Sequence, residues 1–210
     1  MPIQSDSLNE EKLSLQLVIN FANTLSSRGS NQPGELLKHY NDLLTWSVQS
    51  GQIGVDKAQA LMDAACQVPE KGEQALQRAL LLREAIFHLI EAAKEKSTPQ
   101  QSDLDTLNNE LAVAARHYKL VFQLDHFAWE WERTTENLEQ VLWPIAQAAA
   151  DLLDSAHLQR VGICEDEICR WLFYDTSKNH SRRWCDMDDC GNRAKARRHY
   201  ARKKVITAPN

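Results

Sequence analysis

Four of the five cysteines in this chain lie in its C-terminal quarter, as two pairs: Cys164 with Cys169, and Cys185 with Cys190. Four residues separate the members of each pair, and fifteen residues separate the two pairs. Two close pairs of thiolates, joined by an insert long enough for a hairpin, can supply the four corners of a tetrahedral metal site. We therefore expect the ion, more than hydrophobic burial, to hold this segment together.

Zinc suits the cysteine pattern best. Iron–sulfur clusters also use four cysteines, but their common spacings are tighter. Disulfides are disfavoured in a reducing cytosol, and the N-terminus shows no signal peptide. Because four protein thiolates leave no position for water or substrate, the predicted zinc is single and structural. The fifth cysteine, Cys66, lies in a helical pattern and is expected to be a buried small hydrophobe.

Charge is divided unevenly along the chain. The net charge is −5, but residues 170–204 carry 11 Lys/Arg against 4 Asp/Glu, and the remainder carries 13 against 25. An acidic body with a basic C-terminal segment is typical of a protein that meets an anion through that segment, most often a nucleic acid. No apolar run is long enough to span a membrane. A cytoplasmic protein without membrane contact is therefore expected.

Hydrophobic periodicity predicts a helical body. Ser7 and Glu10 have the spacing of a capping box, Gly51 and Pro69 mark the ends of the second and third helices, and Pro99 suits the first turn of the fifth. The expected helices span residues 7–25, 36–48, 55–68, 75–94, 99–116 and 135–155.

The apolar period changes to two between the fifth and the last of these helices. Residues 118–124 and 127–132 alternate in this way around Asp125 and His126, which predicts a β-hairpin. Pro144 falls inside the last helix and should kink or restart it.

A hairpin and a helix are expected around the cysteines. The aromatic segments 171–174 and 182–184 should pair as short strands across a polar turn, and residues 193–204 should form a helix. Knuckle, hairpin and helix around one zinc make a treble-clef-like plan. The overall prediction is an α+β fold, mainly α, with a helical domain over residues 1–158 and a zinc module over residues 159–210.

The basic helix is the candidate nucleic-acid interface. Ala194, Ala201 and Val205 form a thin apolar stripe with cations on both sides, as expected for a helix that packs on its own module and faces phosphates. The candidate contacts are Arg182, Arg183, Asn192, Arg193, Lys195, Arg197, Arg198, Arg202 and Lys203.

Some of these candidates have an alternative role within the fold. Arg182, Arg183 and Arg193 could neutralise the two negative charges of a zinc–tetrathiolate centre. Asn192 and Arg193 could read adenine and guanine, but the Asn192 amide could equally bond a nearby backbone group.

In the body, Asn23, Trp46 and Arg83 are candidate ligand residues. Arg83 lies on a mainly apolar helix, where its guanidinium could bind the carboxylate or phosphate of a small-molecule effector or form a buried ion pair. Three more tryptophans could line a pocket or pack in the core: Trp129, Trp131 and Trp143. A homodimer contact is another possible role for the body. No nucleophile motif or phosphate-binding glycine loop is evident, so no enzymatic activity is expected.

The stretch from Cys185 to His199 resembles the CGNR zinc-finger family, whose name is the tetrapeptide that stands here as Cys190-Gly191-Asn192-Arg193. Residues 171–175 and 181–185 match the hairpin of that family, and the resemblance spans about residues 160–204. It implies zinc held by Cys164, Cys169, Cys185 and Cys190.

The preceding region resembles the ABATE domain that often accompanies this finger in stress-induced transcription regulators. The matching positions are Asn23-Thr24, Leu43-Leu44 with Trp46, Gly51, and Leu82-Arg83. A family aspartate near the start of the pattern stands here as Asn20.

Three functions compete on this basis. The leading hypothesis is a zinc-dependent, DNA-binding transcription regulator whose basic helix contacts phosphates. The second is an RNA-binding module, in which Trp171, Tyr174 and Trp184 stack on unpaired bases instead of forming a miniature core. The third is a body that binds a small molecule or protein, with the zinc module as a scaffold.

Overall fold

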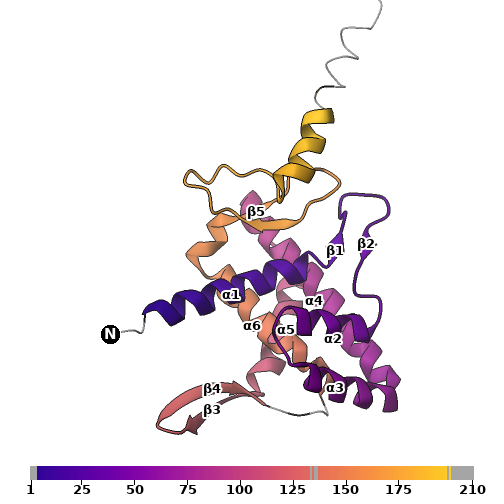
Figure 1. Cartoon of the computed structure of the whole chain (residues 1–210), viewed down its shortest axis with the longest axis vertical. Helices are drawn as coiled ribbons and strands as arrows, with labels where there is room; N and C mark the ends of the chain where they lie inside the picture. Colours follow the sequence, from indigo (N-terminus) through magenta and orange to yellow (C-terminus); the bar gives the residue numbers. More distant parts are fainter. Residues whose placement is uncertain (1–3, 133, 135–136, 198, 200–210) are drawn as a thin grey trace, which may run out of the picture.

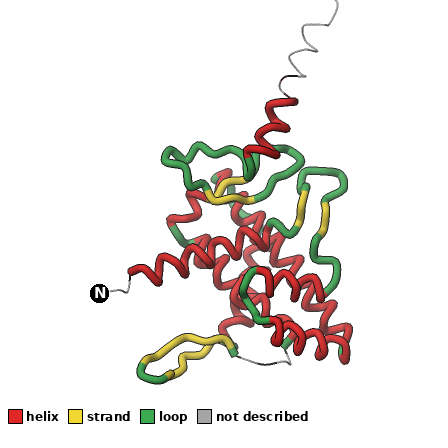
Figure 2. The backbone as a smooth tube through the Cα atoms, viewed as in Figure 1, coloured by secondary structure: helices red, strands yellow, loops and turns green. Residues whose placement is uncertain are grey.

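The computed structural model describes residues 4–132, 134, 137–197 and 199. These residues form a mainly helical body with small antiparallel strand pairs (Figures 1 and 2), which confirms the predicted fold class. The body helices are α1 (Gln4–Ala22), α2 (Tyr40–Gln49), α3 (Val55–Gln67), α4 (Pro69–Glu95), α5 (Gln101–Ala115) and α6 (Trp143–Leu153).

Helix α4 is the longest helix and contacts every other helix of the body. Its apolar side chains recur at helical spacing, and Leu82, Ile86 and Ile90 are almost completely buried. Helix α6 packs against α1 and α5 as well as α4, and its Ile145 lies in the same core. One hydrophobic core therefore joins the first and last helices of the body.

The helix boundaries differ from the prediction where side chains cap the backbone. Helix α2 begins at Tyr40, four residues later than expected, because the Asp42 carboxylate accepts the backbone N–H groups of Lys38 and His39. Helix α4 begins at Pro69, six residues earlier than expected. Proline is favoured in a first helical turn, so Pro69 begins this helix as well as following the end of α3.

A two-residue strand pair was missed between α1 and α2. Strand β1 (Leu25–Ser26) pairs with β2 (Gly34–Glu35), and Leu25 therefore lies outside the first helix. Cys66 was also misplaced, because its side chain is exposed on α3 and not buried.

The predicted β-hairpin is confirmed. Strand β3 (Tyr118–Gln123) pairs with β4 (His126–Trp131) in an antiparallel register that sets Tyr118 opposite Trp131. After it, a short 3₁₀ helix, η1 (Leu138–Leu142), ends where α6 begins. Pro144 lies in the first turn of α6, so the last body helix restarts there as expected.

The strand pairing predicted for the zinc module is wrong. Strand β6 (Leu172–Tyr174) pairs with β5 (Val161–Ile163), and residues 182–184 form no strand. Gly162 permits the observed pairing, because an added Cβ there would lie 2.4 Å from the Phe173 ring. The absence of a side chain there leaves room for this ring, and β5 can approach β6 closely.

The strand pair β5–β6 continues the core of the body. Val161 and Leu172 lie in the same buried cluster as the residues of α1 and α4, and η2 (Ala156–Arg160) leads directly into β5. The domain boundary between residues 158 and 159 stays a prediction.

Among the described residues, no helix is both long enough and apolar enough to cross a membrane.

Candidate zinc centre and basic face

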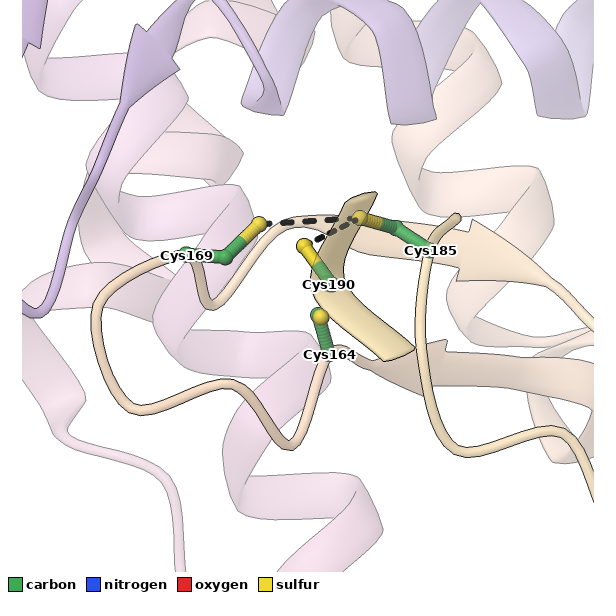
Figure 3. A group of neighbouring side chains, drawn as sticks. All are labelled: Cys164, Cys169, Cys185 and Cys190. Carbon is green, nitrogen blue, oxygen red and sulfur yellow. Dashed lines mark hydrogen bonds between the residues drawn. The ribbon is translucent and has the colours of Figure 1, made fainter. Parts of the chain in front are cut away.

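The four cysteines come together from four different backbone positions. Cys164 follows β5, Cys169 ends a turn, Cys185 follows the loop after β6, and Cys190 lies in a single π-helical turn, η3 (Met187–Gly191). Their sulfur atoms all lie within 4.8 Å of one another and point toward a common centre (Figure 3). The Sγ atoms of Cys169 and Cys190 each lie 3.6 Å from that of Cys185.

These distances fit zinc. Four sulfurs at about 2.3 Å from a tetrahedral zinc ion lie about 3.8 Å apart. Small adjustments of side-chain rotamers would therefore bring the four thiolates to such an ion.

The four sulfurs do not all ionise unless a cation is bound. Hydrogen bonding with Cys169 lowers the pKa of Cys164 to about 5, whereas burial raises the pKa of Cys190 to about 12. Four thiols buried together do not carry several negative charges unless a cation compensates those charges. A divalent zinc ion supplies that compensation and releases the remaining thiol protons.

Each cysteine pair is held by an aspartate between its members. In the first pair, the Asp166 carbonyl accepts the N–H of Cys169 at 2.9 Å, and its carboxylate accepts that of Ile168 at 3.1 Å. In the second pair, the Asp186 carboxylate accepts the N–H groups of Asp188 and Asp189 at 2.7 and 2.9 Å. These bonds shape both turns that present the sulfurs.

Asp166 also binds the start of the basic helix, which covers residues 192–197 and 199. The Asp166 side chain is 0% exposed and accepts Nε of Arg193 at 2.9 Å and Nη2 of Arg197 at 3.1 Å. Burial alone would raise the pKa of Asp166, but the bonds from Arg193, Ile168 and Arg197 hold the pKa below its usual value. The carboxylate is therefore ionised and fixes one face of the helix to the first cysteine turn.

The role of Asp166 was missed by sequence reasoning. The available signal was an acidic side chain inside a C-x4-C turn that is followed by a strongly basic helix.

Arg193 lies beside the sulfur cluster, although its side chain is partly exposed. Besides Asp166, its guanidinium contacts the Asp189 carboxylate and donates to the Cys190 sulfur at 2.9 Å. This arrangement matches the neutralising role considered for Arg193. Asn192 donates to the Asp188 carbonyl at 2.7 Å, which is the local backbone bond considered as its alternative.

Arg182 and Arg183 are also engaged within the module. Arg182 donates to the carbonyls of Trp184 and Cys185 and lies 5.0 Å from the Phe173 ring centroid. Arg183 pairs with Glu165 and lies over the Trp184 ring. Both side chains are partly exposed, but these contacts already use much of their donor capacity.

Among the candidate cations that the structure describes, Lys195 has the fewest internal contacts. It is exposed, and no hydrogen bond or ion pair joins it to the other described residues. Arg197 is also about half exposed, although it bonds Asp166. Three further candidates, Arg198, Arg202 and Lys203, lie outside the described residues.

The aromatic residues considered for RNA stacking are packed in the fold. Trp171 is half-buried against the cysteine cluster and donates to the Leu25 carbonyl at 3.1 Å. Trp184 packs on the same cluster, and Tyr174 packs on the body core. Their arrangement matches the miniature core considered above.

The three ligand candidates of the body do not form a common pocket. The Asn23 amide pairs with both backbone groups of Leu172 at 2.9 Å, so it joins α1 to β6. Trp46 packs on Phe21 in the core, with ring centroids 5.2 Å apart. These contacts give both side chains a structural role.

Arg83 forms the buried ion pair that was its alternative role. It is 3% exposed and makes two bonds of 2.7 Å to the Glu35 carboxylate. It also bonds Glu84 at 2.8 Å and the Thr24 hydroxyl at 3.2 Å. The carboxylate that its guanidinium was predicted to bind is therefore supplied by β2.

Comparison with known proteins agrees with this arrangement. Residues 160–203 match the CGNR zinc finger, which contains the four cysteines and the start of the basic helix. Residues 15–156 match the ABATE family, described as "putative stress-induced transcription regulator". A search among curated proteins found no match. The ABATE match covers more than half of the chain, and the chain therefore belongs to the ABATE family and carries a CGNR zinc finger after the ABATE region.

Proposed function

We propose that this protein is a zinc-dependent, DNA-binding transcription regulator that contacts phosphates through its basic C-terminal helix. The observation that carries the proposal is the fixed start of that helix. Asp166 binds Arg193 and Arg197 on one face, while Lys195 is exposed. Seven Lys/Arg residues lie within positions 193–204.

The position of the helix supports this role. Its described turns project away from the helical body beyond the zinc module (Figure 1). The chain outside residues 170–204 carries 25 Asp/Glu and only 13 Lys/Arg, so the body would be repelled by a polyanion. A duplex would therefore meet the protein through the module and not through the body.

In this mechanism zinc acts indirectly. Bound to the four thiolates, it would hold the two cysteine turns in place. Asp166 and Arg193 then set the direction of the helix, and Lys195 with the cations further along would contact phosphates. Such contacts carry no base specificity, so general affinity for duplex DNA is the first property to measure.

The test is fluorescence anisotropy with random duplex DNA at about 50 and 200 mM salt, using zinc-loaded and chelated protein. We expect binding that needs zinc and weakens steeply with salt. The triple variant Lys195→Ala, Arg202→Ala, Lys203→Ala should reduce the slope of log K against log salt by about 1 for each lost phosphate contact. Lys71→Ala, which removes an exposed cation at the start of α4, is the control. It should change neither the affinity for DNA nor the slope of log K against log salt.

Two results would overturn the proposal. One is no zinc-dependent binding at the lower salt concentration. The other is single-stranded RNA competing far better than duplex DNA, which would favour the RNA-binding alternative.

A further inference from the structure

One face of the β3–β4 hairpin is made only of apolar and aromatic side chains. Residues that lie directly opposite each other in an antiparallel pair share a face. Three such pairs form what we call the apolar face: Tyr118 with Trp131, Leu120 with Trp129, and Phe122 with Phe127. The other face is mixed and includes the charged pair of Lys119 opposite Glu130.

The fold leaves most of the apolar face uncovered. The hairpin projects away from the helical body (Figure 1), and among the described elements each of its strands contacts chiefly the other strand. Four side chains of this face are each more than half exposed: Leu120, Phe122, Phe127 and Trp129. A two-stranded hairpin alone is only marginally stable in water and needs a further strand or helix against its apolar side. A partner that covers this face would therefore stabilise the hairpin.

The tip of the hairpin carries a leucine that nothing within the chain accounts for. Leu124 has a φ of 53°, in the left-handed region that glycine and asparagine tolerate far better than leucine. Its side chain is 98% exposed, so packing within the chain does not offset this backbone preference. A residue that breaks a local rule without a compensating internal contact points to a contact outside the chain.

An apolar cleft lies at the other end of the same face. It has a volume of about 650 Å³, and its apolar lining includes Ile53, Trp129, Trp131, Val141 and Trp143. Trp129 and Trp131 belong to the apolar face, which therefore runs into the cleft without a break. Strands of six residues are about 20 Å long, and this length separates the projecting leucine from the cleft.

This layout is complementary to itself. In a two-fold dimer every contact is made twice, because the same surface of each copy meets the other. If two apolar faces pack together with their hairpins pointing in opposite directions, the tip of each hairpin reaches the base of the other. The leucine at each tip would then meet the cleft of the second copy.

The available area is sufficient for a dimer of moderate affinity. A fully buried aromatic side chain covers about 150–250 Å², so the four exposed side chains with Leu124 present roughly 500–600 Å² in each copy. Pairing two copies would bury about 1,000 Å² in total, which is the lower limit for a specific interface. Contacts inside the two clefts add to this area.

We propose that the apolar face of the hairpin is a homodimer interface. Two hairpins pack face to face about a two-fold axis, and Leu124 of each copy enters the cleft of the other. The interface is separate from the cysteine cluster and the basic helix, and the proposal does not depend on DNA binding.

The first test is sedimentation equilibrium of the full-length, zinc-loaded protein between about 1 and 200 μM, around an expected dissociation constant of about 10 μM. Leu124→Asn removes the apolar tip and suits the left-handed backbone better, so the hairpin should persist. We expect it to raise the dissociation constant at least tenfold, because the dimer loses two buried leucines. Leu81→Asn, at an exposed leucine of α4, is the matched control and should dimerise as wild type does.

The second test locates the contact in a one-to-one mixture of two deuterated samples. One keeps protons only at its leucine methyls and the other only at its tryptophan rings, so a nuclear Overhauser effect between them arises only between copies. We expect one from the Leu124 methyls, identified by their loss in Leu124→Asn, to Trp129 or Trp131. Trp46, which packs on Phe21 in the core, should show none.

Three outcomes would overturn the proposal. The first is a protein that stays monomeric at about 200 μM, twenty times the expected dissociation constant. The second is a dimer that Leu124→Asn leaves unchanged or that Leu81→Asn weakens equally, which would place the interface elsewhere. The third is a monomer that binds phosphatidylcholine vesicles and loses this binding in Leu124→Asn, which would assign the apolar face to a lipid surface.

Discussion

At the residue scale, one buried carboxylate connects the metal site to the basic helix. Asp166 shapes the first cysteine turn through its backbone carbonyl and binds Arg193 and Arg197 through its side chain. Arg193 and Arg197, which were predicted to contact DNA, therefore already use some of their hydrogen-bond donors within the zinc module. These bonds fix the direction in which the described turns of the helix leave the zinc module.

Replacing Asp166 with asparagine tests this connection. We expect Asp166→Asn to keep all four sulfur ligands and one zinc per chain. Its free energy of unfolding should fall by about 2 kcal/mol, because two arginines lose a buried charged acceptor while remaining partly exposed to water. Urea unfolding with excess zinc measures the change. Asp188→Asn, at an exposed carboxylate of the second turn, should stay near wild type; an equal loss in both variants would contradict this role.

Arg83 makes the second prediction at this scale. Removing its guanidinium in Arg83→Ala leaves the Glu35 carboxylate without its ion-pair partner, whereas Glu84 keeps its pair with Arg28. We expect a loss of about 3 kcal/mol in the free energy of unfolding. Thermal or urea unfolding checks it, with the exposed Arg116→Ala as a control that should change stability by less than about 0.5 kcal/mol. A fully stable Arg83→Ala protein would return this residue to the list of ligand candidates.

At the scale of elements, one side chain joins the zinc module to the body by hydrogen-bonding the backbone of β6 as a neighbouring strand would. The Asn23 amide makes the two bonds to Leu172 that a neighbouring backbone would make. Two further bonds run between the same regions, from Trp171 Nε1 to the Leu25 carbonyl and from the Gly29 N–H to the Ile168 carbonyl. The end of α1 and the following loop therefore support the zinc module directly.

Asn23→Ala is expected to loosen this junction. The buried N–H and C=O of Leu172 would lose their partner, which should cost about 1–3 kcal/mol in the free energy of unfolding. Hydrogen exchange should show faster exchange at Leu172 with little change in α5. The control is Asn109→Ala, at an exposed position of that helix. If Leu172 stays as protected as in wild type, Asn23 does not hold β6.

At the scale of the whole molecule, two kinds of stabilisation meet. The body has a continuous hydrophobic core that extends to Val161 and Leu172. The second buried cluster, around the sulfurs, consists of the four cysteines with Trp171 and Trp184. Such a small cluster buries little apolar surface, so the metal must supply most of its folding free energy.

Removal of zinc should therefore unfold only the C-terminal segment. In a chelated sample, or in Cys190→Ser, we expect the helical circular dichroism signal to remain largely intact. Limited proteolysis should then cleave after β6, in the loop and turns that the metal holds. Cys66→Ser, which changes the exposed cysteine of α3, should bind one zinc and resist cleavage as wild type does. Cooperative loss of the whole helical signal would mean that the body also depends on the metal.

Much of the fold could be predicted because its signals are local. Alternating apolar residues identified β3 and β4, and Pro144 marked the restart of the last helix. The metal ligands were predictable for a similar reason, because the short spacing within each cysteine pair already limits how the sulfurs can be placed. The predicted first residue of α2 was wrong because the Asp42 carboxylate caps the backbone before Tyr40. The predicted first residue of α4 was wrong because proline is favoured in a first helical turn, so the helix already begins at Pro69.

The sequence by itself determined the helical class, the hairpin and the zinc ligands, since each follows from periodicity or spacing within a short stretch. Only the tertiary structure decided which partner each strand and charge would take. Gly162 allows β5 to approach β6 closely, Glu35 completes the Arg83 ion pair, and Asp166 binds Arg193. These choices depend on the distance between groups far apart in the chain and on how much water remains around them. Folding sets both this distance and this hydration, and neither can be read from the order of residues alone.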